Sequence, residues 1–248
     1  MCIASGRAFD TLPSEVVTIP GIEYAITSNG AAVYEIKDKK CLNSYVLKES
    51  SVAGIINNTV GYPVTYEAFI RGKAYASKEY MADPVKFGAT PKAIEYVRST
   101  RTLQEDIVSF IYEHKHELDS IDIVLDDDEL KNMIIKELYE KDPDIYITSS
   151  VKQLIEISYK DAGKKSGVRF LADRLGIDRK NIAAFGDADN DCDMIEFAGA
   201  GVAMGNACDA LKEAADYITL SNDDDGLAYA IYNLSLIHIS EPTRRTPI

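Results

Sequence analysis

The sequence predicts an α/β protein with a doubly wound, mostly parallel core sheet that is interrupted by an inserted α+β domain. Two patterns predict this class. Strand-like and helix-like segments alternate regularly over the last third of the chain, as they do in parallel sheets. Between about residues 47 and 155 this alternation gives way to strands paired through tight turns. The 248 residues, 46% of them hydrophobic, are enough for a substantial apolar interior.

The first segment, residues 1–46, predicts one part of the α/β core. A strand over Met1–Ala4 is followed by a helical turn near Phe9–Val17 and then by the extended stretch "YAITSNGAAVYEI". Within that stretch, Gly30 permits a tight backbone after Asn29.

The middle segment, residues 47–155, predicts the α+β insert. Helical spacing of apolar residues predicts two helices, one on Val52, Ile55, Ile56 and Val60 and one on Leu103, Ile107, Phe110 and Ile111. A hairpin is predicted to turn at Arg71-Gly72 within "YPVTYEAFIRGKAYAS". The strand "IDIVL", a helix over residues 129–140 and the strand "IYITSS" complete this segment.

The final segment returns to strict alternation. Strands are predicted over residues 154–158, 182–185, 201–204 and 217–220, with helices over residues 166–175, 189–197 and 209–215. A sheet whose successive strands are separated by helices is mostly parallel. We therefore expect a discontinuous core, residues 1–46 and 156–233, and a cap domain formed by residues 47–155.

Composition disfavours several classes of function. The net charge of −13 and the lack of a basic stripe argue against nucleic-acid binding, but small phosphorylated partners need only one or two local cations. The four cysteines share no metal-type spacing, and no signal peptide or long apolar run is present. These features predict a reduced, cytoplasmic protein without a membrane segment, and they leave its oligomeric state open.

The stretch "IAAFGDADND" carries a cluster of acids at the end of a predicted strand. Ligands bind at this edge of open α/β sheets, so we expect Asp187 to coordinate a hard cation such as Mg²⁺. Asp189 and Asp193 are interpreted as acids in the first turn of a helix. A calcium loop of the EF-hand type is rejected, because Cys192 and Ala198 stand where glycine and a bidentate glutamate are required.

Two further features gain meaning only in combination. Lys164 lies at the start of a predicted helix, where a lysine either points to solvent or meets an anion. Ser5 and Gly6 follow a strand and offer a hydroxyl and a backbone N–H, which is half of a phosphate cradle. Each feature alone is compatible with an ordinary surface lysine or strand-to-helix turn. The order strand-Ser-Gly-Arg, "SNGA", Lys and "GDADND" is far more specific.

In this order the motifs resemble those of the haloacid dehalogenase superfamily, in particular its Cof-type (subclass IIB) sugar-phosphate phosphatases. The matching stretches are "IASGR", "ITSNGAAVY", "KDAGKKSGVRFLADRLGI", "AFGDADNDCDM", "AGVAMGNA" and "DDDGLAYAI". They span essentially residues 1–233, and the insert has the position and hairpin content of that family's cap domain. The resemblance implies an enzyme that hydrolyses a small phosphorylated metabolite, such as a sugar phosphate, with Mg²⁺ and through an aspartyl-phosphate intermediate.

The resemblance also implies roles for individual residues. Ser5 and the Gly6 amide would bind the transferring phosphoryl oxygens, while Lys164 would neutralise the phosphate and orient the nucleophile. Asp187 would ligate Mg²⁺, and Asp191 would belong to the same metal site by supporting its water shell and the lysine. Ser5, Lys164, Asp187 and Asp191 are therefore the implied catalytic residues.

Four more residues are implied to bind phosphate or substrate. Asn190 would support the metal's water shell together with Asp191. Arg7 and Asn29 would line the cavity near the substrate, and Asn206 in "MGNA" is a further candidate.

One motif of that family is not found ahead of "IASGR". Family members carry D-x-D a few dozen residues earlier, where the first Asp is the nucleophile and the second is the general acid/base. Here Asp10 and Glu15 come after the serine motif and cannot substitute by position. At the other end, "LSLIHISEPTR" matches the translation of a sequencing adapter, so residues 234–248 are expected to be a non-native tail.

The two ends predict a truncated fragment whose central first core strand is missing. Unpaired inner strand edges would then be left, so we expect poor stability and no Mg²⁺-dependent turnover from this chain. The alternative is a degenerate protein that binds phosphosugars without hydrolysing them. A phosphosugar mutase of related fold is the enzymatic rival. A response-regulator receiver domain is disfavoured, because its acids precede its hydroxyl residue and its lysine comes last.

Overall fold

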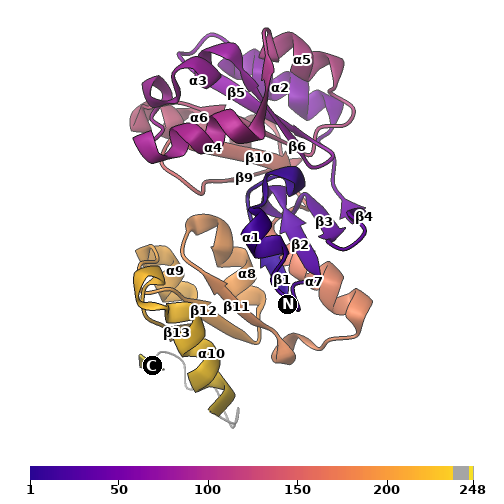
Figure 1. The fold of residues 1–248 in the computed structure, drawn as a ribbon. Coiled ribbons are helices and arrows are strands. Elements are labelled where there is room, and N and C mark those ends of the chain that lie inside the picture. Colours follow the sequence, from indigo (N-terminus) through magenta and orange to yellow (C-terminus); the bar gives the residue numbers. More distant parts are fainter. Residues whose placement is uncertain (237–245, 248) are drawn as a thin grey trace. The chain divides into compact units, whose positions relative to one another are not determined.

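The computed structural model describes residues 1–236 and 246–247 (Figure 1). The chain divides into two compact units, residues 1–163 and residues 164–248. No helix in the described part of the chain is long and apolar enough to cross a membrane.

The first unit begins with a small sheet in the strand order β1-β2-β3-β4. Strand β1 (Cys2–Ala4) pairs in parallel with β2 (Tyr24–Thr27), and the short η1 (Phe9–Thr11) and α1 (Ser14–Val17) lie between them in sequence. Strands β3 (Ala32–Glu35) and β4 (Lys40–Ser44) continue the sheet antiparallel. The predicted first strand, helical turn and extended stretch are confirmed.

A tight turn, η2 (Ser28–Gly30), joins β2 to β3. Its three residues have positive φ angles of 47°, 52° and 89° in chain order. Glycine is required at the third position for a steric reason as well, because a Cβ on Gly30 would lie 1.9 Å from the carbonyl oxygen of Gly163. The predicted tight backbone at Gly30, after Asn29, is confirmed.

The rest of the first unit is built on a six-stranded sheet in the order β7-β6-β5-β8-β10-β9. Its strands are β5 (Thr65–Ile70), β6 (Lys73–Ser77), β7 (Arg101–Gln104), β8 (Ser120–Val124), β9 (Ile145–Thr148) and β10 (Leu154–Tyr159). The hairpin between β5 and β6 turns at Arg71-Gly72, where both residues have positive φ as a type I′ turn requires. The predicted hairpin is confirmed.

One face of this sheet carries the main apolar core. Isoleucines of β8 and β10, including Ile121, Ile123 and Ile155, pack with residues of α2 (Glu49–Thr59), α5 (Ile107–Glu113) and α6 (Asp128–Lys141). The opposite face is partly covered at one end by α3 (Lys78–Ala82), η3 (Pro84–Phe87), η4 (Pro91–Ala93) and α4 (Ile94–Thr100). Because side chains alternate along a strand, every second residue faces the main apolar core and the residues between them face the partly covered side of the sheet.

Three details of the insert differ from the prediction. The segment 154–158 was expected to begin the parallel core, but β10 pairs antiparallel with β8 and β9. Alternation shows which residues of a strand are buried but does not identify the neighbouring strand. Leu103 lies in β7 and is 44% exposed, so it does not belong to the predicted helix, and Val60 is also exposed after the end of α2.

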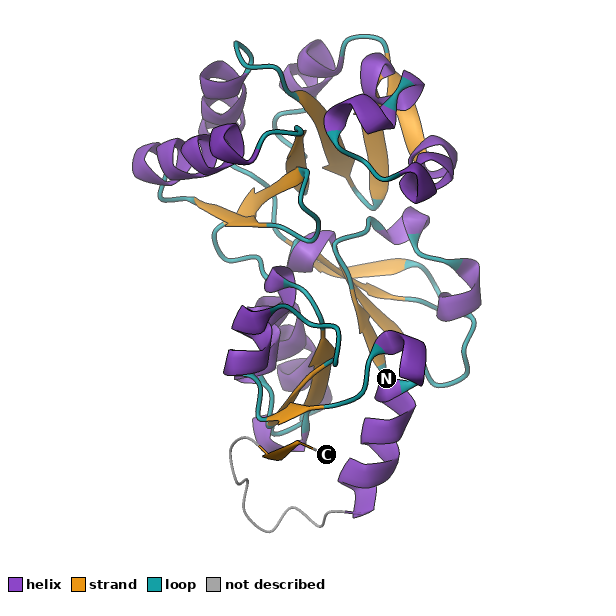
Figure 2. Ribbon diagram, turned by 90° about the vertical axis from the view of Figure 1, so that its left-hand side faces the viewer, coloured by secondary structure: helices purple, strands orange, loops and turns teal. Residues whose placement is uncertain are grey.

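The second unit alternates helices and strands (Figure 2). Its elements are α7 (Lys164–Leu175), η5 (Arg179–Asn181), β11 (Ala183–Gly186), η6 (Asp189–Asp191), α8 (Cys192–Phe197), β12 (Ala200–Ala203), α9 (Asp209–Ala214), β13 (Tyr217–Ile218), η7 (Asn222–Asp224), α10 (Gly226–Leu236) and β14 (Thr246–Pro247). The strands β11, β12, β13 and β14 form a parallel sheet, which confirms the predicted alternation.

The core–cap division and the non-native tail remain predictions. A core–cap boundary at residue 156 would fall inside β10. The predicted core segments, 1–46 and 156–233, and the predicted cap, 47–155, differ from the two compact units of the chain. Most of the expected non-native tail, residues 234–248, lies outside the described residues, including His238.

Asp119 makes the stability of the first unit depend on pH. It is buried directly before β8, and burial raises the pKa of its carboxyl to about 7. An acid whose pKa is higher in the folded state stabilises the fold when protonated, so its contribution is complete below about pH 4 and is lost as pH rises to about 7. We expect Asp119→Asn to raise the Tm at pH 8 relative to wild type, with the two curves converging near pH 4. Parallel pH profiles of the two proteins would contradict this.

Candidate functional site

The acidic loop after β11 is shaped by a glycine. Strand β11 ends at Gly186, and a Cβ at this position would lie 2.5 Å from the Cβ of Asp191. Only glycine therefore lets the chain fold back so closely that Asp191 reaches the start of its own loop.

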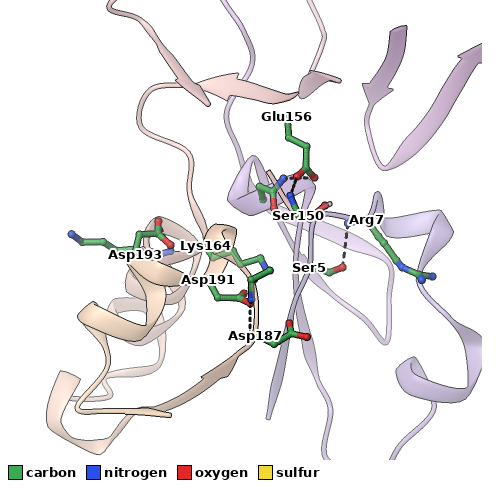
Figure 3. Close-up of polar contacts among 11 residues, drawn as sticks. Ser5, Arg7, Ser150, Glu156, Lys164, Asp187, Asp191 and Asp193 are labelled. Carbon is green, nitrogen blue, oxygen red and sulfur yellow. Dashed lines mark hydrogen bonds and ion pairs between the residues drawn. The ribbon is translucent and has the colours of Figure 1, made fainter. Parts of the chain in front are cut away.

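Asp191 is the organising residue of this loop. Its Oδ2 accepts hydrogen bonds from the backbone N–H groups of Asp187, at 3.0 Å, and of Ala188, at 3.3 Å. Its Oδ1 pairs with Lys164 Nζ at 2.5 Å (Figure 3). Lys164 and Asp191 are only 4% and 5% exposed. The pair thus fixes the first residue of α7 to the loop that follows β11.

Asp187 is held by its neighbours but keeps one oxygen available. Its Oδ2 accepts from Asn206 Nδ2 at 3.1 Å, and Asn206 Oδ1 in turn accepts from the backbone N–H of Asn222 at 3.0 Å. The backbone N–H of Cys208 donates to Asp187 O. The side chain is exposed, and its Oδ1 has no hydrogen-bond partner among the described residues.

These residues fit a Mg²⁺ ion in a limited way. Asp187 Oδ1 can serve as a single carboxylate ligand, and Mg²⁺ in proteins commonly keeps several waters beside one or two carboxylates. Both oxygens of Asp191 already accept hydrogen bonds or pair with Lys164, which suits it to support rather than to direct ligation. Over the described residues, no group of three or more His, Cys, Asp and Glu side chains is arranged to hold a metal by itself.

The other acids of the loop do not cap their own helices. Asp189 and Asp193 lie in the first turns of η6 and α8, as expected, but neither element has a side-chain cap at its start. Asp189 Oδ1 accepts from Cys208 Sγ at 3.1 Å, and Asp193 Oδ2 accepts from the backbone N–H of Lys165 at 3.2 Å. Burial raises the pKa of Asp193. Asn190 between them is buried.

In the first unit, the loop after β1 is locked to the turn after β2. The Ser5 N–H donates to Ile26 O at 2.9 Å, and the Asn29 N–H donates to Ser5 O at 3.1 Å. The Arg7 N–H donates to Ser5 Oγ at 3.1 Å. Because β1 and β2 are parallel, both connected segments lie at the carboxyl end of the small sheet.

Asn29 and Gly6 meet a residue that the motif analysis missed. Asn29 Nδ2 donates to Glu156 Oε1 at 3.0 Å, and the Ser150 N–H donates to Glu156 Oε2. A Cβ on Gly6 would lie 2.9 Å from Glu156 Oε1. Figure 3 labels Glu156 and Ser150. A single acid inside the apolar strand "LIEISY" was a signal that could have identified Glu156.

Arg7 lies against an aromatic ring of the insert. Its guanidinium carbon is 4.1 Å from the centroid of the Tyr96 ring, in the geometry of a cation–π contact. The predicted site residues thus form two constellations, one in each unit. Ser5, Gly6, Arg7 and Asn29 lie in the first, and Lys164, Asp187, Asn190, Asp191 and Asn206 lie in the second.

Comparisons with known proteins agree with these motifs. A 5-amino-6-(5-phospho-D-ribitylamino)uracil phosphatase of Bacillus subtilis is 42% identical over 107 residues, which is 43% of each protein. A putative phosphatase of Haemophilus influenzae is 47% identical over 91 residues, 37% of this chain and 35% of that protein. The matches therefore span less than half the length of these two relatives.

Longer matches cover nearly the whole chain. A putative phosphatase of Bacillus subtilis is 29% identical over 237 residues, 95% of this chain and 84% of that protein. The solved structure of a haloacid dehalogenase-like hydrolase from B. subtilis has a TM-score of 0.80 at 25% identity, covering 94% of this chain and 87% of that one. A HAD subclass IIB sugar phosphatase shares the fold, with a TM-score of 0.75 at 19% identity over 95% and 85% of the two chains.

These matches confirm the predicted fold class, a parallel α/β core with an inserted α+β cap. Residues 1–231 match the haloacid dehalogenase-like hydrolase family, which covers both constellations of site residues. The chain belongs to the haloacid dehalogenase-like hydrolase family.

Proposed function

We propose that the protein is a Mg²⁺-dependent phosphatase that hydrolyses a small phosphorylated metabolite, such as a sugar or polyol phosphate. The observation that carries the proposal is the buried Lys164–Asp191 pair, because Asp191 lies in the same loop as the exposed carboxylate of Asp187. A curated relative is named for its action on a phosphorylated ribityl compound, and this supports the substrate class.

In the second unit, the site residues would neutralise the charge of the phosphoryl group or hold its ligands in position. Lys164 would bring one positive charge to the phosphoryl oxygens, with its ammonium held in place by Asp191. Asp187 would hold Mg²⁺, which when bound neutralises phosphoryl charge and orients the phosphoryl oxygens. Asn206 would orient the Asp187 carboxylate through its hydrogen bond to Oδ2.

In the first unit, Ser5 and Gly6 would bind phosphoryl oxygens. The Ser5 oxygen already accepts from the Arg7 N–H, so its hydroxyl hydrogen is free to donate to an anion. Arg7 and Asn29 would flank the same position. The family resemblance implies an aspartyl-phosphate intermediate, formed on a carboxylate that we assign to no residue of this chain.

The metal role of Asp187 is tested by titration calorimetry with MgCl₂. We expect Asp187→Asn to weaken Mg²⁺ binding at least about tenfold, because it removes the charge of the proposed ligand. Asp189→Asn is the matched control, since Asp189 is exposed in the same loop but its Oδ1 accepts from Cys208 Sγ. Equal Mg²⁺ affinity of Asp187→Asn and wild type would overturn the metal assignment.

The reaction is tested by assaying sugar and polyol phosphates for free phosphate, with and without Mg²⁺. Release of phosphate would support the phosphatase proposal. Formation of an isomeric phosphate would instead identify a mutase. Binding of phosphate and Mg²⁺ without turnover would favour the alternative of a non-catalytic phosphate-binding protein, and failure to bind either ion would overturn the proposal.

A further inference from the structure

Three acids lie side by side on the polar face of the six-stranded sheet. Glu67 in β5 is paired in register with Asp122 in β8, and Asp122 is paired in register with Glu156 in β10. Directly opposed side chains lie on the same face, with Cβ atoms about 5 Å apart. The three residues are 1%, 5% and 4% exposed. Such a row of buried carboxylates needs compensation.

The row is compensated differently at its three positions. Arg101 in β7 forms two hydrogen bonds to Glu67, at 2.6 and 3.2 Å. Burial, together with the charges of Glu156 and Glu67, raises the pKa of Asp122 well above its usual value, which favours the protonated form of this carboxyl. In the described part of the chain no lysine or arginine pairs with Glu156, whose oxygens accept from Asn29 and Ser150 instead.

The row is connected at both ends to the loop after β1. At one end, the Tyr96 ring lies under both Arg101, at 4.6 Å, and Arg7, at 4.1 Å. At the other end, Glu156 binds the side chain of Asn29, whose N–H donates to Ser5 O. Ser5, Gly6 and Arg7 are consecutive residues, so the segment between them is fixed from two sides.

We propose that Glu156 is a positioning residue, which orients Asn29 and thereby shapes the Ser5–Arg7 loop for binding a phosphoryl group. This inference rests on the proposed function. Glu156 itself would not touch the phosphate, because both of its oxygens accept hydrogen bonds from protein groups. Its Oε1 lies so close to Gly6 that a Cβ at this position would displace the Glu156 carboxylate.

Both oxygens of a carboxylate are needed for this role. Glu156 accepts one hydrogen bond at each oxygen, whereas glutamine has one acceptor oxygen and one NH₂ donor. In Glu156→Gln, an oxygen that stays on Asn29 leaves the NH₂ group against the Ser150 N–H, and an oxygen that stays on Ser150 requires the Asn29 amide to turn so that its Oδ1 accepts from the NH₂ group. In either arrangement Asn29 loses its charged acceptor, so its orientation or its hydrogen bond changes.

The test compares Glu156→Gln with Asp122→Asn, its cross-strand neighbour. Asp122 lies on the same buried row but takes no part in the hydrogen bond between Glu156 and Asn29, so asparagine alters the row without removing that contact. Titration calorimetry with inorganic phosphate is expected to show at least about a fivefold loss of affinity in Glu156→Gln and less than a twofold change in Asp122→Asn. Equal losses in the two variants would overturn the inference.

A second readout does not depend on phosphate binding. The side-chain NH₂ resonances of Asn29 in a ¹⁵N NMR spectrum are expected to shift in Glu156→Gln and to stay in place in Asp122→Asn. Unchanged Asn29 resonances in Glu156→Gln would overturn the positioning role. If wild type binds no phosphate, the proposed function fails, while the Asn29 resonances still decide whether Glu156 holds this side chain.

A further variant keeps the test decisive if Glu156→Gln does not fold. Gly6→Ala leaves Glu156 intact but places a Cβ 2.9 Å from its Oε1 and 3.1 Å from Asn29 Oδ1. The Asn29 resonances are expected to shift, and phosphate affinity is expected to fall as in Glu156→Gln. Asn29 resonances that stay in place in Gly6→Ala would count against the inference.

Discussion

Gly30→Ala is expected to lower the free energy of unfolding of the first unit by about 2 to 5 kcal/mol. The backbone at Gly30 has a φ of 89°, which disfavours any residue with a Cβ. The new Cβ would also lie 1.9 Å from the carbonyl oxygen of Gly163, so backbone on one side must move. That movement would disturb the hydrogen bond from the Gly163 N–H to Asn29 O. Urea denaturation measures the loss.

Two other glycines separate the causes of this effect. Gly176 also has a positive φ, of 67°, but a Cβ there would meet nothing within 4 Å, so Gly176→Ala is expected to cost only about 1 kcal/mol. Gly54 lies inside α2 with open space around it, and Gly54→Ala is expected to stabilise by about 0.5 to 1 kcal/mol. A loss in Gly30→Ala no greater than that in Gly176→Ala would show that the contact with Gly163 is not decisive.

The parts of the site that the sequence predicts well are those determined locally. Gly30 stands where the chain turns back on itself, and Lys164 is the first residue of α7. Asp187 follows directly after a short strand whose pattern is visible in "IAAFG". Each of these features depends on residues close together in the chain, and the family motifs are made of such stretches.

The parts that the sequence does not predict depend on pairing between distant strands. Glu67 and Asp122 are far apart in sequence and become neighbours only because β5 pairs with β8. A second pairing, of β8 with β10, places β10 in the six-stranded sheet and brings Glu156 into the row. Each of these acids stands alone within an apolar strand, which predicts a buried, partnered carboxylate but does not identify its partner.

The sequence predicts the roles of the loop acids only in part, because their hydrogen-bond partners also come from other segments of the chain. Asp189 and Asp193 have the positions of helix-start acids, yet their hydrogen bonds go to Cys208 and to the N–H of Lys165. The sequence predicts that these acids lie in the first turn of a helix. Which group donates a hydrogen bond to each carboxylate depends on the segments that pack beside that turn. Asp191, in the same turn as Asp189, instead accepts hydrogen bonds from the backbone N–H groups of Asp187 and Ala188.

Lys164→Met is expected to reduce both stability and phosphate binding. The Lys164 and Asp191 side chains are 5% and 7% exposed, so methionine leaves a buried carboxylate without its cation. Breaking one partner of such a pair costs about 3 to 5 kcal/mol, and the two N–H bonds to Asp191 Oδ2 place the expected loss near the lower end. Affinity for inorganic phosphate is expected to fall at least about tenfold, because a charge-assisted contact is removed.

Lys165→Met is the matched control, because it changes the neighbouring lysine while leaving the Lys164–Asp191 pair intact. The Lys165 backbone N–H still donates to Asp193, so the start of α7 keeps that contact. Stability is expected to change by less than about 0.5 kcal/mol and phosphate affinity by less than twofold. Urea denaturation and phosphate titration of the two variants then distinguish two contributions of Lys164. If Lys164→Met loses stability but binds phosphate as wild type does, the lysine is a structural partner of Asp191 and not a phosphate ligand.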